Sequence, residues 1–302
     1  MTKKALRIIY MGTPDFAVPS LEVLIENNYN VVAVITAPDK PAGRGQKITK
    51  SAVKVCAEKY NLPVLQPTNL KDPIFLEELT SYNANLQIVV AFRMLPELVW
   101  NMPEIGTFNL HASLLPKYRG AAPINWAIIN GEKETGVTTF FLQHKIDTGD
   151  IIFQDTEPIL DEDNVGSLYA RLMHKGSTLV LKTVQAIETE QYELKPQVGT
   201  AKEAPKIFKE TCEIKWDQPS KTVYDFIRGL SPYPASWTTI NDKQHKIFGS
   251  EIDTKIINST YETDNKTYLR LKTADGSLLI TELQLQGKKR MSIEEYLRGN
   301  KL

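Results

Sequence analysis

The stretch Thr107-Phe-Asn-Leu-His-Ala-Ser-Leu-Leu-Pro116 decides how this sequence is interpreted. If its first five residues are extended, Asn109 and His111 point to the same face, because side chains alternate along a strand. An amide can donate to a developing oxyanion, and an imidazole can move a proton near neutral pH. Asp147 offers a carboxylate that can orient the imidazole and stabilise its charge if the fold brings it close. These three residues suit acyl transfer to an amine without a covalent enzyme intermediate.

The sequence around these residues carries a family resemblance. The run Asn109-Leu-His-Ala-Ser-Leu-Leu-Pro-Lys-Tyr-Arg-Gly-Ala-Ala-Pro-Ile124, with Glu134-Thr-Gly-Val-Thr138 and Asp147-Thr-Gly-Asp150, resembles the folate-dependent formyltransferases. A lone Asn-x-His is common and its histidine is more often structural, whereas Asn-x-His with Ser-Leu-Leu-Pro and a following Asp-x-Gly is specific to this family. The resemblance extends from about Ile8 to Met291 and covers nearly the whole chain.

The resemblance implies an enzyme that uses 10-formyltetrahydrofolate as its formyl donor, with Asn109, His111 and Asp147 as catalytic residues. It also implies which residues border the folate. One group follows the catalytic strand and another follows the apolar run 86–92; they are Ser113, Leu114, Leu115 and Pro116, and Arg93, Met94 and Leu95.

The acceptor is indicated by a different part of the chain. Pro41-Ala-Gly-Arg-Gly45 resembles an inserted loop of the branch of the family that formylates the α-amino group of initiator methionyl-tRNA for translation initiation. Arg and Lys side chains commonly contact phosphates. The expected tRNA contacts lie in this loop and in a basic patch near the C-terminus: Arg44, Lys47, Lys50, Lys288, Lys289 and Arg290.

Other functions remain open at this point. Arg93-Met-Leu95 resembles the branch that formylates glycinamide ribonucleotide, and an amino-sugar nucleotide or water are further possible acceptors. A non-catalytic RNA-binding protein with a relic site is a hypothesis of another class, but it requires a broken catalytic trio. The four histidines lack zinc-ligand spacing, so we expect no metal. Ser113 has no G-x-S-x-G context, which disfavours a serine nucleophile.

Composition sets the general class. The 302 residues are 42% hydrophobic and 24% charged, which is ordinary for a soluble protein with a buried core. Lys+Arg and Asp+Glu number 36 each, so nucleic-acid binding would have to come from local clusters. Cys56 and Cys212 have neither metal-ligand spacing nor the pattern of a disulfide framework. With no signal-like or membrane-spanning run, we expect a cytoplasmic protein with no membrane partner, and a monomer.

The arrangement of apolar runs predicts an α/β fold. Strand-like runs at 6–11, 31–36, 86–92 and 107–111 alternate with helical patterns, which favours a doubly wound, mostly parallel sheet in residues 1–188. Residues 37–50 are rich in Pro and Gly and predict a loop without regular structure. Residues 136–144 and 151–158 predict a strand pair, and 165–187 a long helix.

A composition change predicts where the first domain ends. Residues 189–205 are polar, with Pro196, Gly199 and Pro205, and predict an inter-domain linker. Beyond it, a helix at 217–230 and short strands at 237–240, 244–248, 267–271 and 278–285 are compatible with a small barrel. The resemblance implies that residues 206–302 form an OB-like, tRNA-binding β-barrel domain.

Overall fold

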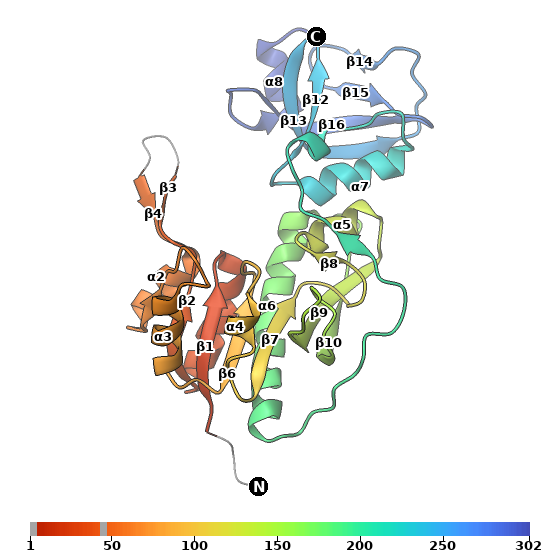
Figure 1. The fold of residues 1–302 in the computed structure, drawn as a ribbon. Helices are drawn as coiled ribbons and strands as arrows, with labels where there is room; N and C mark the ends of the chain where they lie inside the picture. Colours follow the sequence, from red (N-terminus) through yellow and green to blue (C-terminus); the bar gives the residue numbers. More distant parts are fainter. Residues whose placement is uncertain (1–4, 43–46) are drawn as a thin grey trace. The chain divides into compact units, whose positions relative to one another are not determined.

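The computed structural model describes residues 5–42 and 47–302 (Figure 1). The chain divides into two compact units. The first comprises Met1–Arg119, Gly136–Glu157 and Ala170–Glu203, and the second comprises Gly120–Thr135, Pro158–Tyr169 and Ala204–Leu302. The division into 1–188, 189–205 and 206–302 that the sequence indicates stays a prediction.

A mostly parallel sheet forms the centre of the first unit, as predicted. Within the described residues its order is β10-β9-β7-β6-β1-β2-β5. Strands β7, β6, β1, β2 and β5 pair in parallel, and β9 runs antiparallel to β7. The bounds are β1 (Arg7–Gly12), β2 (Asn30–Ile35), β5 (Val64–Leu65), β6 (Leu86–Val90), β7 (Gly106–His111), β9 (Glu134–Phe141) and β10 (Ile151–Pro158).

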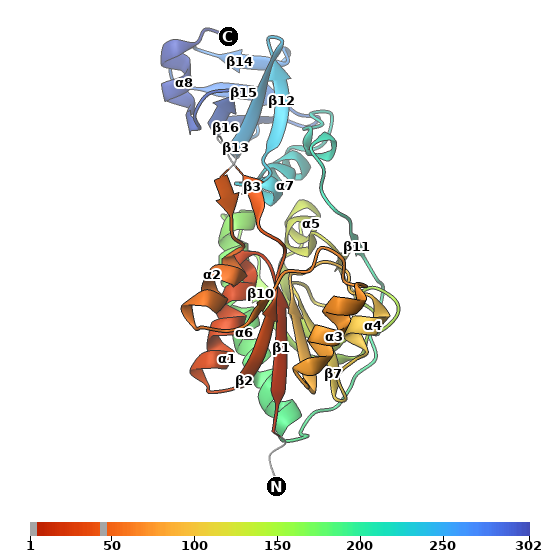
Figure 2. The ribbon, with the colours of Figure 1, turned by 60° about the vertical axis from the view of Figure 1, so that its left-hand side comes forward.

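Helices cover both faces of this sheet (Figure 2). One face carries α1 (Val18–Glu26), α2 (Ala52–Lys59) and the long α6 (Val165–Glu188), and the other carries α3 (Pro73–Ser81) and α4 (Glu97–Trp100). Every residue of β6 is buried, as expected for a parallel strand covered on both sides. The doubly wound α/β prediction is therefore confirmed.

The register of β7 decides which face carries the candidate catalytic residues. Val89 of β6 belongs to the apolar cluster that packs with Leu79 and Val99, next to α3 and α4. Asn109 pairs with Val89 in the β6–β7 register, so its side chain lies on the same face. Leu110 points the other way, toward Gly176 of α6. The alternation predicted for this strand therefore places Asn109 and His111 on the α3/α4 side of the sheet.

The prediction that residues 37–50 lack regular structure is wrong. Two short strands, β3 (Lys40–Ala42) and β4 (Lys47–Thr49), pair antiparallel there. Proline is tolerated because a two-stranded ribbon consists only of edge strands, where a missing N–H need not break a ladder. The chain before β3 is held by side chains, since Lys54 contacts Asp39 at 2.6 Å and Gln66 bonds to both Ala37 and Asp39.

The C-terminal unit is an antiparallel β structure. Among described residues its strand order is β12-β13-β16-β15-β14, and β17 also pairs with β16. Register shifts around Gly249 interrupt the β13–β16 pairing, and such bulges bend a strand. The predicted β domain is therefore confirmed as a curved half-barrel. The bounds are β12 (Ser236–Ile240), β13 (Lys243–Asp253), β14 (Tyr261–Thr263), β15 (Leu269–Lys272), β16 (Ser277–Leu285) and β17 (Met291–Ser292).

Two helices of the C-terminal unit pack against its sheet. Helices α7 (Ser220–Leu230) and α8 (Ile293–Gly299) contribute Val223, Ile227 and Tyr296 to one apolar cluster with Ile247 and Leu278. Helix α5 (Pro123–Ile129) packs on α7, where the Asn125 amide donates to the Gly229 carbonyl at 2.8 Å. The short strands β8 (Arg119–Gly120) and β11 (Glu203–Ala204) pair with each other.

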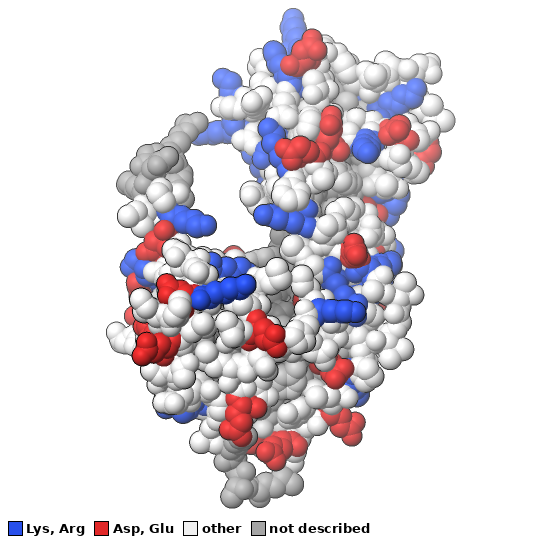
Figure 3. Space-filling model, viewed as in Figure 1, with Lys and Arg blue, Asp and Glu red and all other residues white. Residues whose placement is uncertain are grey.

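Charges of both signs are mixed on one face of the molecule. On the face seen in Figure 3, Lys and Arg are interspersed with Asp and Glu in both units. No helix within residues 5–42 and 47–302 combines the length and apolar character needed to cross a membrane.

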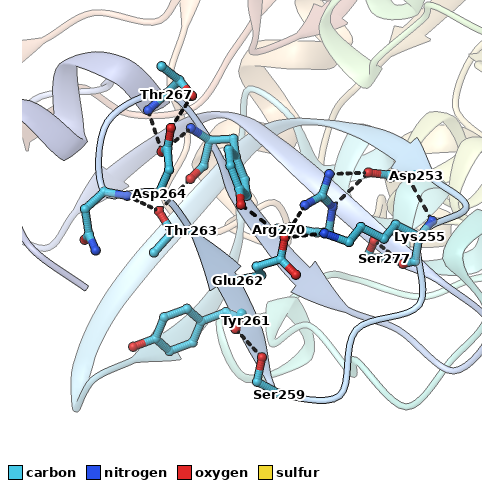
Figure 4. Close-up of polar contacts among 12 residues, drawn as sticks. Asp253, Lys255, Ser259, Tyr261, Glu262, Thr263, Asp264, Thr267, Arg270 and Ser277 are labelled. Carbon is cyan, nitrogen blue, oxygen red and sulfur yellow. Dashed lines mark hydrogen bonds and ion pairs between the residues drawn. The ribbon is translucent and has the colours of Figure 1, made fainter.

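A network of ion pairs ties three strands of the half-barrel together (Figure 4). Arg270 donates to Asp253 and to Glu262, each at 2.8 Å, and Lys255 contacts Glu262 at 2.5 Å. The pKa of Asp253 lies below its ordinary value of 3.8. The main cause is the hydrogen bond from the backbone N–H of Lys255, and the hydrogen bond from Arg270 is the second cause. Lys255 holds the pKa of Glu262 below 4.5.

This network predicts an acid-sensitive stability. Because the folded pKa values are lowered, the stabilisation is complete above the ordinary values and is lost as the pH falls through the folded ones. We expect the unfolding temperature to decrease as the pH falls below about 4, and to decrease less in Asp253→Asn. Calorimetry between about pH 3 and pH 7, a range that spans the ordinary carboxyl pKa values, checks this. Asp242→Asn, at an exposed turn, should keep the wild-type slope; equal slopes in all three proteins would contradict the prediction.

His245 predicts a second pH effect in the same unit. Its Nδ1–H donates to the Lys243 carbonyl, and the Tyr296 hydroxyl donates to Nε2, both at 2.8 Å. The ring is fully buried, and burial lowers the pKa of His245 below 6.5. The neutral ring therefore stabilises the fold above the ordinary pKa, and this stabilisation is lost as the pH falls through the folded value. We expect His245→Gln to lose part of the decrease in unfolding temperature between about pH 7 and pH 5; an undiminished decrease would contradict this.

Candidate active site

The fold brings His111 and Asp147 together. Nδ1 of His111 lies 3.8 Å from Oδ2 of Asp147, and their side chains are only 7% and 13% exposed. Asn109 precedes His111 by two positions on the same face of β7. The amide of Asn109 has no hydrogen-bond partner within the part of the chain that the structure describes, so it can donate to a substrate. The three predicted catalytic residues thus share one end of β7.

The imidazole is oriented by a backbone group. Nε2–H of His111 donates to the carbonyl oxygen of Tyr118 at 2.7 Å. This bond keeps the proton on Nε2, so Nδ1 is the basic nitrogen and faces Asp147. At 3.8 Å the carboxylate is within ion-pair range but too far for a hydrogen bond. Sequence reasoning missed Tyr118, because a backbone carbonyl that acts from a loop has no residue-type signature.

The loop that carries Asp147 begins after β9 and packs against the last residue of that strand, Phe141. Asp147 has a φ of 52°, a conformation that non-glycine residues rarely adopt, and the Thr148 hydroxyl donates to the Lys145 carbonyl at 2.9 Å. A Cβ on Gly149 would lie 1.7 Å from the carbonyl oxygen of Phe141. Only glycine fits at position 149, which explains the glycine two residues after Asp147.

The loop after β7 is fixed to the neighbouring strands. The hydroxyl of Thr138 donates to the Ser113 carbonyl at 2.6 Å, and Gln154 donates to the Leu115 carbonyl at 2.9 Å. The Ser113 hydroxyl donates to the Lys117 carbonyl at 2.6 Å. Ser113 and Leu115 are buried, whereas Leu114 and Pro116 are half-buried. Of these four predicted folate contacts, Leu114 and Pro116 therefore have the more accessible side chains.

A cavity of about 910 Å³ lies beside α4. Its lining includes the other three predicted folate contacts, Arg93, Met94 and Leu95, together with residues 68–71 and 96–98. The Arg93 guanidinium donates to the backbone carbonyls of Pro67 and Thr68, so it ties two walls of the cavity together. Asn109, His111 and Asp147 are not among its lining residues.

The predicted tRNA contacts differ in exposure and in their ion-pair partners. Arg44 lies outside the described residues, as does the side chain of Lys47. Lys50 pairs with Glu58 at 2.7 Å. Lys288 and Lys289 are exposed. Arg290 pairs with Glu282 and lies over the ring of Phe248, 4.4 Å from its centroid.

No group of three or more His, Cys, Asp or Glu residues in the described ranges has the geometry to hold a metal ion. The two cysteines are buried free thiols, and burial raises the pKa of Cys56 to about 11.

Two family models match this chain. A family model described as formyl transferase matches residues 6–184, and one described as formyl transferase, C-terminal domain, matches residues 206–301. The chain belongs to the formyl transferase family.

Two relatives place it more narrowly. The methionyl-tRNA formyltransferases of Bacteroides fragilis and Bacteroides thetaiotaomicron are each 56% identical to it. The alignments cover 99% and 100% of this chain, and 96% and 98% of theirs. Within the family, the chain belongs with the methionyl-tRNA formyltransferases.

A solved structure supports the fold alone. The N-formyltransferase from Helicobacter canadensis, in complex with folinic acid and dTDP-3-aminofucose, is 24% identical, with a TM-score of 0.70 over 95% of this chain and 100% of that one.

Proposed function

We propose that the protein transfers the formyl group of 10-formyltetrahydrofolate to the α-amino group of initiator methionyl-tRNA, giving N-formylmethionyl-tRNA for translation initiation. One observation supports this most strongly. The imidazole of His111 lies 3.8 Å from the carboxylate of Asp147, and Asn109 lies two positions before His111 on the same face of β7. The relatives that match this chain over its full length, at 56% identity, are methionyl-tRNA formyltransferases.

Asn109 and His111 act on the oxygen of the formyl group. Attack of the neutral amine on the formyl carbon places negative charge on that oxygen. The Asn109 amide and a protonated Nδ1 of His111 donate hydrogen bonds to it, and each such donor typically lowers the barrier by about 3 kcal/mol. The Tyr118 carbonyl supports this role because it accepts from Nε2 and leaves Nδ1 for the substrate.

The Asp147 carboxylate has two roles: it stabilises the charged imidazole of His111, and it transfers a proton. Its carboxylate stabilises the imidazolium form of His111 across 3.8 Å. The attacking amine must lose a proton, and N10 of the folate must gain one when its bond to the formyl carbon breaks. Asp147 accepts the proton from the amine side and returns it toward N10, so the reaction balances without an outside acid or base.

We place the folate against two segments. The loop after β7 contributes Ser113, Leu114, Leu115 and Pro116. Because the side chains of Ser113 and Leu115 are buried, these two residues contact the folate through their backbone groups. Arg93, Met94 and Leu95 form the second segment, and the adjoining cavity of about 910 Å³ has the size of a small-molecule site.

We place the tRNA against the basic residues of segment 44–50 and of the C-terminal unit: Arg44, Lys47, Lys50, Lys288, Lys289 and Arg290. Lys288 and Lys289 are exposed and can contact phosphates as they stand. Lys50 and Arg290 would exchange carboxylates for phosphates. We further propose that residues 206–302 form the tRNA-binding domain and that the protein acts as a monomer in the cytoplasm.

An acceptor-competition assay tests this function. The purified protein is supplied with 10-formyltetrahydrofolate and, separately, with initiator methionyl-tRNA, glycinamide ribonucleotide, an amino-sugar nucleotide or water alone. We expect rapid transfer to the methionyl-tRNA only. Transfer to another acceptor, or salt-dependent tRNA binding without formyl transfer, would overturn the proposal.

A further inference from the structure

The 189–205 segment runs along the loop that carries Asp147. The backbones of Lys195 and Ile151 exchange two hydrogen bonds, of 2.8 and 2.9 Å. Further on, the Arg119 N–H donates to the Lys202 carbonyl at 2.9 Å. Between these two attachments, Gln197 is the one residue of 193–203 that is not exposed. The segment is therefore attached to the catalytic unit by backbone hydrogen bonds at two places.

The side chain of Gln197 bridges the Asp147 loop and an arginine. Its Nε2 donates to the carbonyl oxygens of Asp147 and Gly149, each at 2.9 Å. Its Oε1 accepts from Nε and Nη2 of Arg119, at 3.1 and 2.7 Å. Two carbonyls on one side and a guanidinium on the other allow only one orientation of the amide. Both N–H groups of the amide are therefore used.

Both members of the His111–Asp147 pair are thus held by adjacent residues. The Tyr118 carbonyl fixes the His111 ring, and the neighbouring Arg119 holds Gln197, which fixes the Asp147 loop. The bonds from Gln197 flank Thr148 on both sides. They offset the unfavourable backbone conformation of Asp147, whose φ is 52°.

We infer that Gln197, held by Arg119, is a positioning residue that keeps the Asp147 carboxylate in reach of His111. It acts through the Asp147 loop, to which both of its amide N–H groups donate. The inference rests on the proposed function, because that function makes Asp147 catalytic. Gln197 is a residue of the segment that the sequence assigns to a linker.

Gln197→Glu is the decisive substitution. It keeps the size and the acceptor for Arg119, but it places a carboxylate oxygen against two carbonyl oxygens and so releases the loop. Because a misplacement of about 1 Å can cost about 100-fold in rate, we expect kcat to fall by about 10- to 100-fold. The KM values for both substrates and the unfolding temperature should stay close to those of the wild type. Gln185→Glu makes the same charge change at an exposed position of α6 and should keep the wild-type kcat.

Two further measurements separate positioning from general damage. In an Asp147→Asn background, adding Gln197→Glu should lower kcat no further, because residues that act as a unit are not additive. Hydrogen exchange of residues 145–150 should speed up in Gln197→Glu, while exchange in the half-barrel stays unchanged.

Unchanged kcat in Gln197→Glu, additive losses in the double variant, or unchanged exchange of residues 145–150 would each overturn the inference. If the wild type transfers no formyl group, the proposed function fails, and the exchange measurement still decides whether Gln197 holds the loop.

Discussion

Replacing His111 by alanine is expected to lower kcat for formyl transfer by about 1,000-fold or more. The substitution removes two contributions at once. Nδ1 no longer donates to the formyl oxygen, and the Asp147 carboxylate loses the imidazolium that it stabilises across 3.8 Å. Each contribution alone is typically worth about 100-fold or more. Because neither depends on substrate binding in the ground state, the KM values should change little.

Steady-state and single-turnover formyl transfer with initiator methionyl-tRNA measure this effect. The substitution also leaves the buried carbonyl of Tyr118 without its donor, which costs about 1–3 kcal/mol of stability. An unfolding curve must therefore accompany each rate. His174→Ala, at an exposed position of α6, serves as the matched control and should keep wild-type turnover. A folded His111→Ala protein with a rate near the wild type would rule out the proposed mechanism.

Gly149→Ala is expected to lower kcat by about 100-fold or more, although it adds a single methyl group. The new Cβ would lie 1.7 Å from the Phe141 carbonyl oxygen and 3.2 Å from Cδ2 of Phe140. The neighbouring backbone of β9 cannot yield, since it is paired within the sheet. The loop must therefore move, and it takes Asp147 away from His111. We expect a stability loss of about 1–3 kcal/mol, as for other overpacked sites.

Gly299→Ala is the matched control, because a Cβ at the end of α8 would meet nothing within 4 Å. Kinetics and thermal unfolding of the two variants are compared with the wild type. We expect Gly299→Ala to be indistinguishable from the wild type in rate. Full activity in Gly149→Ala would show that the position of the Asp147 carboxylate does not limit the reaction.

Much of the fold follows from local patterns. The run at 86–92, apolar apart from Gln87, predicts a strand buried on both faces, and β6 is such a strand. Alternation at 107–111 predicts one shared face for Asn109 and His111, and the register of β7 agrees. Residues 37–50 were predicted less well, because Pro and Gly disfavour central strands but are tolerated in a two-stranded ribbon. The strand predicted at 244–248 extends to Asp253, because β13 continues through a bulge at Gly249.

The sequence by itself determined most strands and helices of the sheet and the family resemblance, and it singled out the amide, imidazole and carboxylate as candidates, because residue type and spacing encode these directly. Only the tertiary structure decided that Asp147 meets His111, that the Tyr118 carbonyl leaves Nδ1 as the basic nitrogen, and that Gln197 holds the Asp147 loop. These contacts join segments far apart in the chain, and most use backbone carbonyls, which every residue possesses. Their positions are therefore set by strand register and loop packing.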